Sequence, residues 1–183
     1  RGPDGVLAVM ILRIRRFREF NIRFGYSSGD QLIAVLAEQV LQSLRPVDEL
    51  IQVGACDFAI LLPSLISPEH AALAAAKIMR LFQSPISIEG RLMPVEAAIG
   101  VALHPEHGDD PDQLFRRAER AYGQARASID RYAVFETAPG EIDIGHSYVR
   151  GGDLPDVPPT RGGLLGADTA IENGRHRLTR IYD

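Results

Sequence analysis

The chain has 183 residues, of which 45% are hydrophobic, with a formal net charge of -4 and an isoelectric point near 5.7. This length and composition allow one full hydrophobic core, so we expect a single domain with an extension. The acidic balance argues against a general attraction to nucleic acid or anionic lipid, and the single cysteine excludes an internal disulfide framework. No apolar run reaches the roughly 20 residues that a membrane span needs, so we expect no direct membrane insertion.

We expect a cytoplasmic location, because the single cysteine and the absence of a signal peptide fit a reducing compartment. The chain also lacks an initiator Met and opens on Arg1. We therefore interpret it as the cytoplasmic part of a longer or membrane-associated protein.

The first 44 residues predict a strand followed by two helices. Residues 6–12 form a continuous apolar run, which is typical of a strand buried on both faces. Within residues 13–25, aromatic and aliphatic side chains at helical spacing predict a short amphipathic helix that ends at Gly25. Residues 31–44 have apolar side chains spaced as in a helix with one buried face.

The rest of the predicted domain alternates hairpins and helices. Apolar runs at 50–53 and 58–62 flank a short turn and predict a β-hairpin. The later segments predict, in order, a helix over 70–82, a second hairpin from 86–88 and 92–103, a helix over 113–128 and a strand over 132–135. This order of elements predicts an α/β domain over residues 6–136.

The composition changes after residue 136. Eight of the 17 glycines and four of the 12 prolines follow this position, which is typical of a flexible linker. We place the linker at 137–163 and a C-terminal extension at 164–183. Within the extension, residues 167–173 predict a short helix and residues 175–182 alternate like a strand.

Residues 45–58 hold two motifs. Arg45 and Asp48 form an R-x-x-D sequence, and after five intervening residues the chain reads Gly54-Ala55-Cys56-Asp57-Phe58. This layout resembles the GGDEF domain of diguanylate cyclases, in which R-x-x-D precedes a Gly-Gly-Asp/Glu-Glu-Phe signature. Further matches to the family's patterns occur at Phe17, Asn21, Gly25, Gly29 and Asp30, and the segment 97–105 is similar to its S-I-G-V-A-x-x-P strand. The resemblance implies a mixed, mainly antiparallel sheet flanked by helices.

The resemblance also implies that active cyclases hold Mg²⁺ with two carboxylates, whose positions fall on Arg13 and Cys56 in this chain. Phosphoryl transfer to a ribose hydroxyl needs Mg²⁺ on hard oxygen ligands. A guanidinium offers only donors, and a thiolate is too soft a ligand for Mg²⁺. We therefore expect a degenerate, catalytically inactive domain that has no metal and no cofactor.

In the family, guanine is read at the positions of Asn21 and Asp30. The chemistry fits, because a carboxylate accepts hydrogen bonds from the N1 and N2 donors of the base; the alternative is that Asn21 caps one helix and Asp30 opens the next. Family positions that contact the triphosphate fall on Arg126 and Asp130, and a carboxylate at Asp130 repels phosphate. Ala55 replaces a signature glycine and adds a Cβ at a turn. Tight GTP binding is therefore not expected.

Arg45 and Asp48 fall at the family's product-binding site for cyclic di-GMP. A guanidinium donates to O6 and N7 of guanine, and a carboxylate accepts from N1 and N2. The alternative is that the two residues form a surface Arg–Asp pair on a turn. The five-residue spacing between R-x-x-D and the signature favours the binding site. Arg80 falls where the family often supplies a second arginine, and the alternative is a solvated basic face shared with Lys77.

Two other sites are not supported. His104, His107, Asp109 and Asp110 form no closed ligand set, so we interpret them as solvated loop residues rather than a metal site. Arginines alternate with aromatic residues between positions 13 and 24, but the aromatic spacing is that of a helix core, which argues against RNA binding.

We therefore expect a receptor for cyclic di-GMP in bacterial second-messenger signalling. Its partners would be a protein or flanking domains, such as the EAL domain whose entry the extension resembles. The alternatives are a non-catalytic dimerisation or scaffold module, with a homodimer left open, and a regulatory GTP-binding domain. An intact product site distinguishes the receptor from the scaffold.

Overall fold

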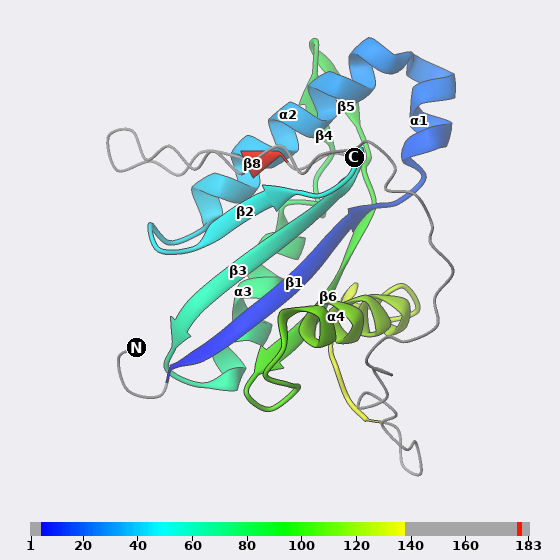
Figure 1. The fold of residues 1–183 in the computed structure, drawn as a ribbon. Coiled ribbons are helices and arrows are strands. Elements are labelled where there is room, and N and C mark those ends of the chain that lie inside the picture. The colour runs from blue at the N-terminus through cyan, green and yellow to red at the C-terminus, as the bar shows by residue number, and fades with distance from the viewer. Residues whose placement is uncertain (1–4, 138–178, 181–183) are drawn as a thin grey trace, which may run out of the picture.

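The structure is a computed structural model that describes residues 5–137 and 179–180. Figure 1 shows its elements in chain colours. They are β1 (Val6–Ile14), α1 (Phe17–Phe24), α2 (Tyr26–Ser43), β2 (Glu49–Gln52), β3 (Asp57–Leu65), α3 (Pro68–Arg80), β4 (Ile86–Ile88), β5 (Arg91–Met93), β6 (Ala97–His104), α4 (Pro111–Ala125), β7 (Tyr132–Val134) and β8 (Thr179–Arg180).

β1 lies inside the main sheet, whose strand order is β7-β6-β1-β3-β2-β8. It pairs antiparallel with both β3 and β6, and β2 pairs antiparallel with β3. The outer pairs β6–β7 and β2–β8 are parallel, while β4 and β5 form a separate antiparallel pair. The expected mixed, mainly antiparallel sheet is therefore confirmed.

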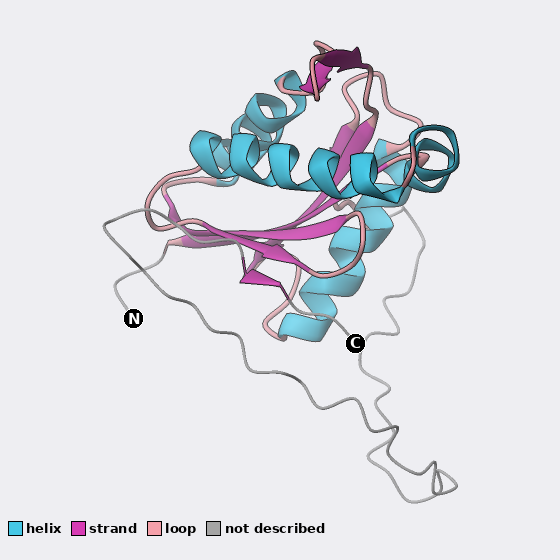
Figure 2. Cartoon of the chain, turned by 90° about the horizontal axis from the view of Figure 1, so that it is seen from above, coloured by secondary structure: helices cyan, strands magenta, loops and turns pink. Residues whose placement is uncertain are grey.

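Helices cover both faces of the sheet: α2 and α3 pack on one face and α4 on the other (Figure 2). Alternate residues of β1 serve the two layers. Met10 and Leu12 belong to the core that includes α2 and α3, whereas Val9 and Ile11 belong to the cluster with α4. Because side chains alternate along a strand, a continuous apolar run is what burial on both faces requires.

The first helix begins later than the sequence predicts. Residues 13 and 14 of the predicted range belong to β1, because Arg13 pairs with Asp57 of β3 and Ile14 with Ala97 of β6. The left-handed backbone at Arg16, with φ 55°, then separates the strand from α1. The apolar spacing runs through both elements, so the pattern alone does not mark the boundary.

The predicted strand over 92–103 is interrupted. β5 ends at Met93 and β6 begins at Ala97, with Pro94 between them. Proline has no N–H to donate within a strand, which explains the break. β5 therefore pairs with β4 outside the main sheet, while β6 joins β1 inside it.

Most of the predicted linker (137–163) and extension (164–183) lies outside the described residues, apart from Thr137 and β8. In the part of the chain that is described, no helix is both long and apolar enough to cross a membrane.

Candidate functional site

The end of β1 and the turn between β2 and β3 lie side by side. The Ile14 N–H donates to the carbonyl oxygen of Cys56 over 3.0 Å, and the Val53 N–H closes the turn on the carbonyl of Asp57 over 2.9 Å. Ala55 is exposed in this turn, and Phe58 is buried in the core. The hairpin predicted from sequence is present, and it brings the segment 54–58 next to Arg13.

Arg13 makes an ion pair with the signature carboxylate. Its Nε donates to Oδ1 of Asp57 over 2.8 Å, its guanidinium carbon lies 4.8 Å from the ring centroid of Tyr122, and its Nη2 is 3.8 Å from Oε1 of Glu119. Burial by itself lowers the pKa of Arg13, but the hydrogen bond and the charge of Asp57 outweigh it, and the pKa is raised. A permanent cation therefore stands between the end of β1 and the turn.

Cys56 stays a neutral thiol at physiological pH. Burial, together with the charge and the hydrogen bond of Asp57, raises the pKa of Cys56 to about 11. Its Sγ donates to Oδ1 of Asp57 over 3.6 Å. Because the thiolate and not the thiol ligates metals, this side chain is a poor metal ligand. Within the described residues, no group of three or more His, Cys, Asp or Glu side chains is arranged to hold a metal ion.

The two histidines of the β6–α4 loop have different environments. His104 lies 3.5 Å from Asp109 between Nε2 and Oδ1, near the surface. His107 is buried, and its Nδ1 accepts a hydrogen bond from the Leu103 N–H over 2.9 Å. The prediction of a solvated residue was therefore wrong for His107, which folds back onto the backbone of its own loop.

Asn21 lies inside α1 and Asp30 inside α2, so neither caps a helix. The two helices meet closely at Gly29, where a Cβ would lie 1.8 Å from Oδ1 of Asn21. This Oδ1 is buried and has no hydrogen-bond partner among the described residues. Buried acceptors are usually satisfied, so an unpaired one at the contact between the two helices is an exception. Asp30 is exposed.

Arg45 and Asp48 form a closed pair directly after α2. Oδ2 of Asp48 accepts from the backbone N–H of Arg45, and Oδ1 accepts from Nη2 of Arg45, both over 2.8 Å. Nη2 also donates to the carbonyl of Pro63 in β3 over 2.8 Å. The side chain of Asp48 is only 3% exposed, whereas that of Arg45 is 46% exposed. The carboxylate is thus fixed and covered by a guanidinium that is open to solvent.

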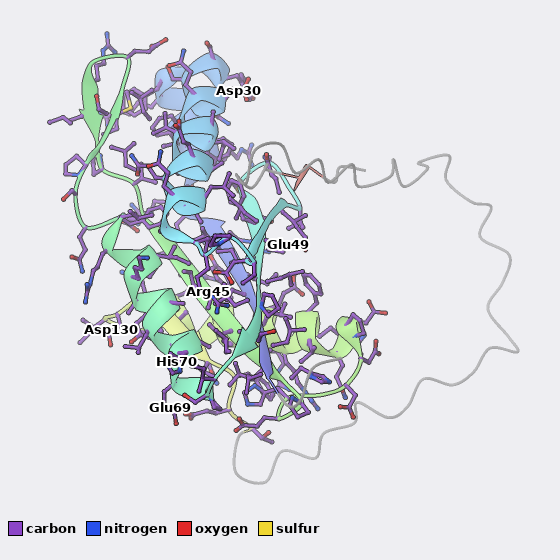
Figure 3. The ribbon with its side chains drawn as sticks, turned by 90° about the vertical axis from the view of Figure 1, so that its left-hand side faces the viewer. Asp30, Arg45, Glu49, Glu69, His70 and Asp130 are labelled. Atoms are coloured by element: carbon purple, nitrogen blue, oxygen red, sulfur yellow. The ribbon has the colours of Figure 1, made fainter. Side chains whose placement is uncertain are left out.

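A cavity of about 250 Å³ adjoins this pair. Leu44, Arg45 and Asp48 line one side, and His70 and Lys77 of α3 line the other. Figure 3 shows Arg45 and His70 on the same side of the molecule and Asp30 at the opposite end of α2. The structure therefore brings the R-x-x-D loop together with α3, and it keeps this cavity separate from the predicted guanine-reading residues.

Arg80 does not reach this cavity. It lines a different pocket of about 440 Å³, together with Glu96 and Asp130. Sequence reasoning left His70 and Lys77 of α3 out of the site, and Nζ of Lys77 donates to the carbonyl of Ser43 at the end of α2 over 2.8 Å. Their helical spacing of seven residues was the available signal.

A family model described as diguanylate cyclase, GGDEF domain, matches residues 3–130. Diguanylate cyclase TpbB from Pseudomonas aeruginosa is 35% identical over 116 residues, which are 63% of this chain and 27% of TpbB. Cyclic di-GMP phosphodiesterase NbdA from the same species is 31% identical over 121 residues, which are 66% of this chain and 15% of NbdA. The chain thus spans about a quarter or less of the length of these relatives.

The crystal structure of the GGDEF domain of TpbB has a TM-score of 0.69 and 32% identity to this chain, and the similarity covers 73% of this chain and 84% of that one. The strands β1, β2, β3 and β6 of the sheet, the helices on its two faces and the turn between β2 and β3 all belong to the matched range, whereas β7 and β8 lie beyond it. Because the family model covers well over half of the sequence, this chain belongs to the GGDEF-domain family of diguanylate cyclases.

Proposed function

We propose that this chain is a non-catalytic GGDEF domain that binds cyclic di-GMP in the cytoplasm and acts as a receptor in bacterial second-messenger signalling. The observation that carries the proposal is the closed Arg45–Asp48 pair at the rim of a cavity, formed by residues that are independent of the turn with Arg13 and Cys56. The site needs no metal, because a guanidinium and a carboxylate recognise guanine directly.

The contacts of Arg13 support the absence of catalysis. Mg²⁺ at the turn would have to displace a guanidinium that is hydrogen-bonded to Asp57 and stacked on Tyr122. The nearest alternative ligand, the thiol of Cys56, is protonated at neutral pH. Without a bound divalent cation the triphosphate is not neutralised and the attacking hydroxyl is not activated.

Ligand binding at the R-x-x-D loop requires an exchange of partners. The guanidinium of Arg45 must leave Asp48 to donate to O6 and N7 of a guanine, and this movement uncovers the carboxylate for N1 and N2. The exchange leaves Asp48 with the backbone N–H of Arg45 as a donor. A cavity of about 250 Å³ suits one base of the dinucleotide, with the rest of the ligand on the surface. Lys77 supplies a second cation for its phosphates.

Titration calorimetry with cyclic di-GMP tests the receptor. Arg45→Ala should weaken binding by about tenfold or more, since a bidentate contact to guanine contributes roughly 1–3 kcal/mol. Asp48→Asn, which keeps the shape of the side chain, should also weaken it. Lys77→Ala should reduce affinity, whereas Arg80→Ala, at an exposed arginine of the same helix, should leave it unchanged; the opposite result would assign the second cation to Arg80.

Two outcomes would reject the receptor. If cyclic di-GMP gives no heat of binding, or binds equally well to Arg45→Ala, the domain acts as a dimerisation or scaffold module instead. Incubation with GTP and Mg²⁺ tests the other half of the proposal, and formation of cyclic di-GMP would show that the domain is an active cyclase.

A second candidate is a regulatory GTP-binding domain. It is favoured by the unpaired, buried Oδ1 of Asn21 between α1 and α2, because the N1 or N2 donors of guanine would satisfy such an acceptor. GTP should then bind without turnover, and Asn21→Ala should weaken GTP while leaving cyclic di-GMP binding intact. Equal GTP binding by Asn21→Ala would remove this candidate.

A further inference from the structure

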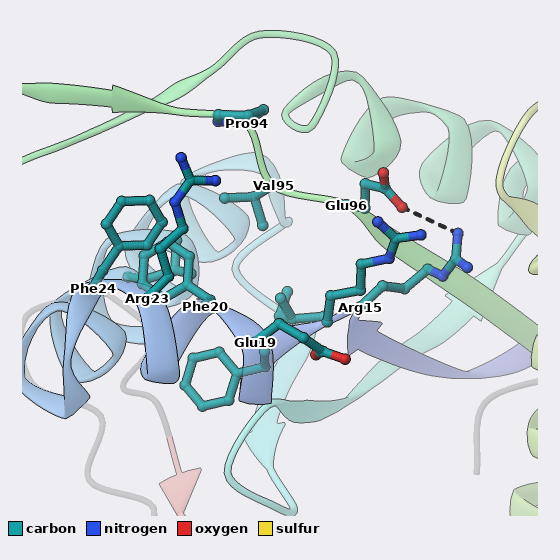
Figure 4. Close-up of a pocket in the computed structure, with 12 residues that line it drawn as sticks. Arg15, Glu19, Phe20, Arg23, Phe24, Pro94, Val95 and Glu96 are labelled. Carbon is teal, nitrogen blue, oxygen red and sulfur yellow. Dashed lines mark hydrogen bonds and ion pairs between the residues drawn. The ribbon is translucent and has the colours of Figure 1, made fainter.

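A second cavity lies on the other side of α1, between this helix and the segment 94–96 that joins β5 to β6 (Figure 4). Its volume is about 300 Å³, which is at the lower end of the range of small-molecule sites. Its apolar lining includes Phe20, Phe24, Pro94 and Val95. The rings of Phe20 and Phe24 lie 4.9 Å apart at an angle of 47°. One wall of the cavity is therefore formed by two phenyl rings that pack against each other.

Three arginines line the same cavity. Arg15 is held in place by Glu96, through Nη1 and Oε2 at 3.2 Å and through its backbone N–H and the Glu96 carbonyl at 2.8 Å. Arg16 and Arg23 make no ion pair with a carboxylate of the described residues, and the guanidinium carbon of Arg23 lies 5.1 Å from the ring centroid of Phe24. Glu19 is the other acidic residue in the lining. Two guanidiniums are thus free to receive an anion.

A neighbouring pocket of about 370 Å³ continues the cavity toward the β4–β5 hairpin. It shares Arg23, Phe24 and Pro94 with the first cavity, and it adds Arg91 and Leu92. Arg23 therefore lines both hollows, and neither Arg16 in the first nor Arg91 in the second makes an ion pair with a carboxylate of the described part of the chain.

This cavity is distinct from the sites described above. Neither Asn21 nor Asp30 lines it, nor do Arg13, Cys56 and Arg45. The separation follows from helix geometry, because residues 20, 23 and 24 share one face of α1, while Asn21 faces Gly29 of α2.

We propose that this cavity binds a nucleoside monophosphate, with the phosphate on Arg16 and Arg23 and the base against Phe24 and Pro94. Guanidinium groups bind phosphate through paired, charge-assisted hydrogen bonds, which are about twice as strong as neutral ones. A flat, apolar ring is what the phenyl and proline surfaces accommodate. Because Arg23 stacks on Phe24, its guanidinium lies beside the apolar surface that would contact the base. A single nucleotide can therefore contact the cationic and the apolar surface together.

The test is a titration of the purified chain with AMP, followed by calorimetry and by backbone NMR shifts. AMP should bind and shift the amides of α1 and of residues 95–96, while adenosine and inorganic phosphate should each bind at least about tenfold more weakly. Arg23→Ala should weaken AMP by about tenfold, and Arg16→Ala combined with Arg23→Ala should abolish binding. Arg18→Ala is the matched control, because this arginine lies on the same helix but outside the cavity.

Three results would overturn the proposal: no AMP binding, equal loss of affinity in Arg18→Ala and Arg23→Ala, or loss of AMP binding in Asn21→Ala, which would place the nucleotide in the other site. Thermal unfolding of each variant distinguishes a lost contact from a lost fold. Cyclic di-GMP binding at Arg45 should be the same in Arg23→Ala and in the unmodified chain. The proposal for this cavity and the receptor proposal are therefore tested independently.

Discussion

Arg13 supplies the positive charge that pairs with the carboxylate of Asp57. A carboxylate there would need a cation, whereas the guanidinium is itself the cation that Asp57 requires. We predict that Arg13→Ala lowers the free energy of unfolding by about 1 kcal/mol, since a hydrogen bond to a charged group contributes more than a neutral one but is weakened here by partial solvent exposure. Urea denaturation measures the change.

Arg18→Ala is the control for this prediction, because Arg18 is exposed and makes no ion pair within the described residues. It should change stability by less than about 0.5 kcal/mol. Equal stabilities of Arg13→Ala and Arg18→Ala would mean that the Arg13–Asp57 pair contributes nothing to the fold.

Single residues also show where sequence reasoning succeeds and where it stops. The ion pair of Arg45 with Asp48 was the alternative weighed against the binding site, and it could be expected from sequence because a turn brings residues i and i+3 together. Lys77 and Arg80 required the rotation of α3 on the sheet, which no local pattern contains. The two differ by about 60° around the helix, and this difference puts them in separate pockets.

At the level of elements, α4 and β6 are joined by a contact that only glycine allows. A Cβ at Gly100 would lie 2.0 Å from the carbonyl oxygen of Ala118 and 2.2 Å from the backbone nitrogen of Tyr122. Both atoms belong to the helix backbone and cannot rotate away. Gly100→Ala should therefore cost about 3 kcal/mol or more of stability, or prevent folding.

Gly123 is the matched control, since it lies in the same helix and a Cβ there meets nothing within 4 Å. Gly123→Ala should stabilise the protein by roughly 0.5–1 kcal/mol, because alanine loses less backbone entropy in a helix. Chemical denaturation of both variants checks the pair. A similar change in stability for the two substitutions would show that the backbone of α4 does not contact Gly100 of β6 closely.

Within residues 5–137, the predicted elements were right in type and order, and the errors in their boundaries have physical causes. Strand and helix periodicities were readable over long apolar segments such as β1 and α2. The break after Met93 was missed, because apolar residues continue on both sides of Pro94, although the proline itself was a sequence signal for it. The start of α1, in contrast, depended on the strand pairing of residues 13 and 14, which no local pattern contains.

For the whole molecule, His107 links local packing to the pH dependence of stability. It accepts from the Leu103 N–H at the end of β6, its carbonyl accepts from Arg117 of α4, and its ring meets the edge of Phe135 at a centroid distance of 5.3 Å. Burial lowers the pKa of His107; Glu106 raises it and Arg117 lowers it further, and the result is below the ordinary value of 6.5.

A group whose pKa is depressed by folding binds protons more readily in the unfolded state. Its contribution to stability is present above about pH 6.5 and is lost as the pH falls toward the folded-state value. Because small domains unfold as one unit, this local titration should appear in the global free energy of unfolding. We therefore predict a loss of stability as the pH falls below about 6.5.

The measurement is urea denaturation at several pH values between about 7.5 and about 5.5, with His107→Gln beside the unmodified chain. Glutamine stays neutral throughout and keeps an oxygen acceptor for the Leu103 N–H, so the stability difference between the two proteins should shrink as the pH falls. His104→Gln, at the partly exposed neighbour that lies close to Asp109, should not reproduce this pattern. If the stabilities of His107→Gln and the unmodified chain run parallel over the whole range, protonation of His107 is not what couples the β6–α4 loop to pH.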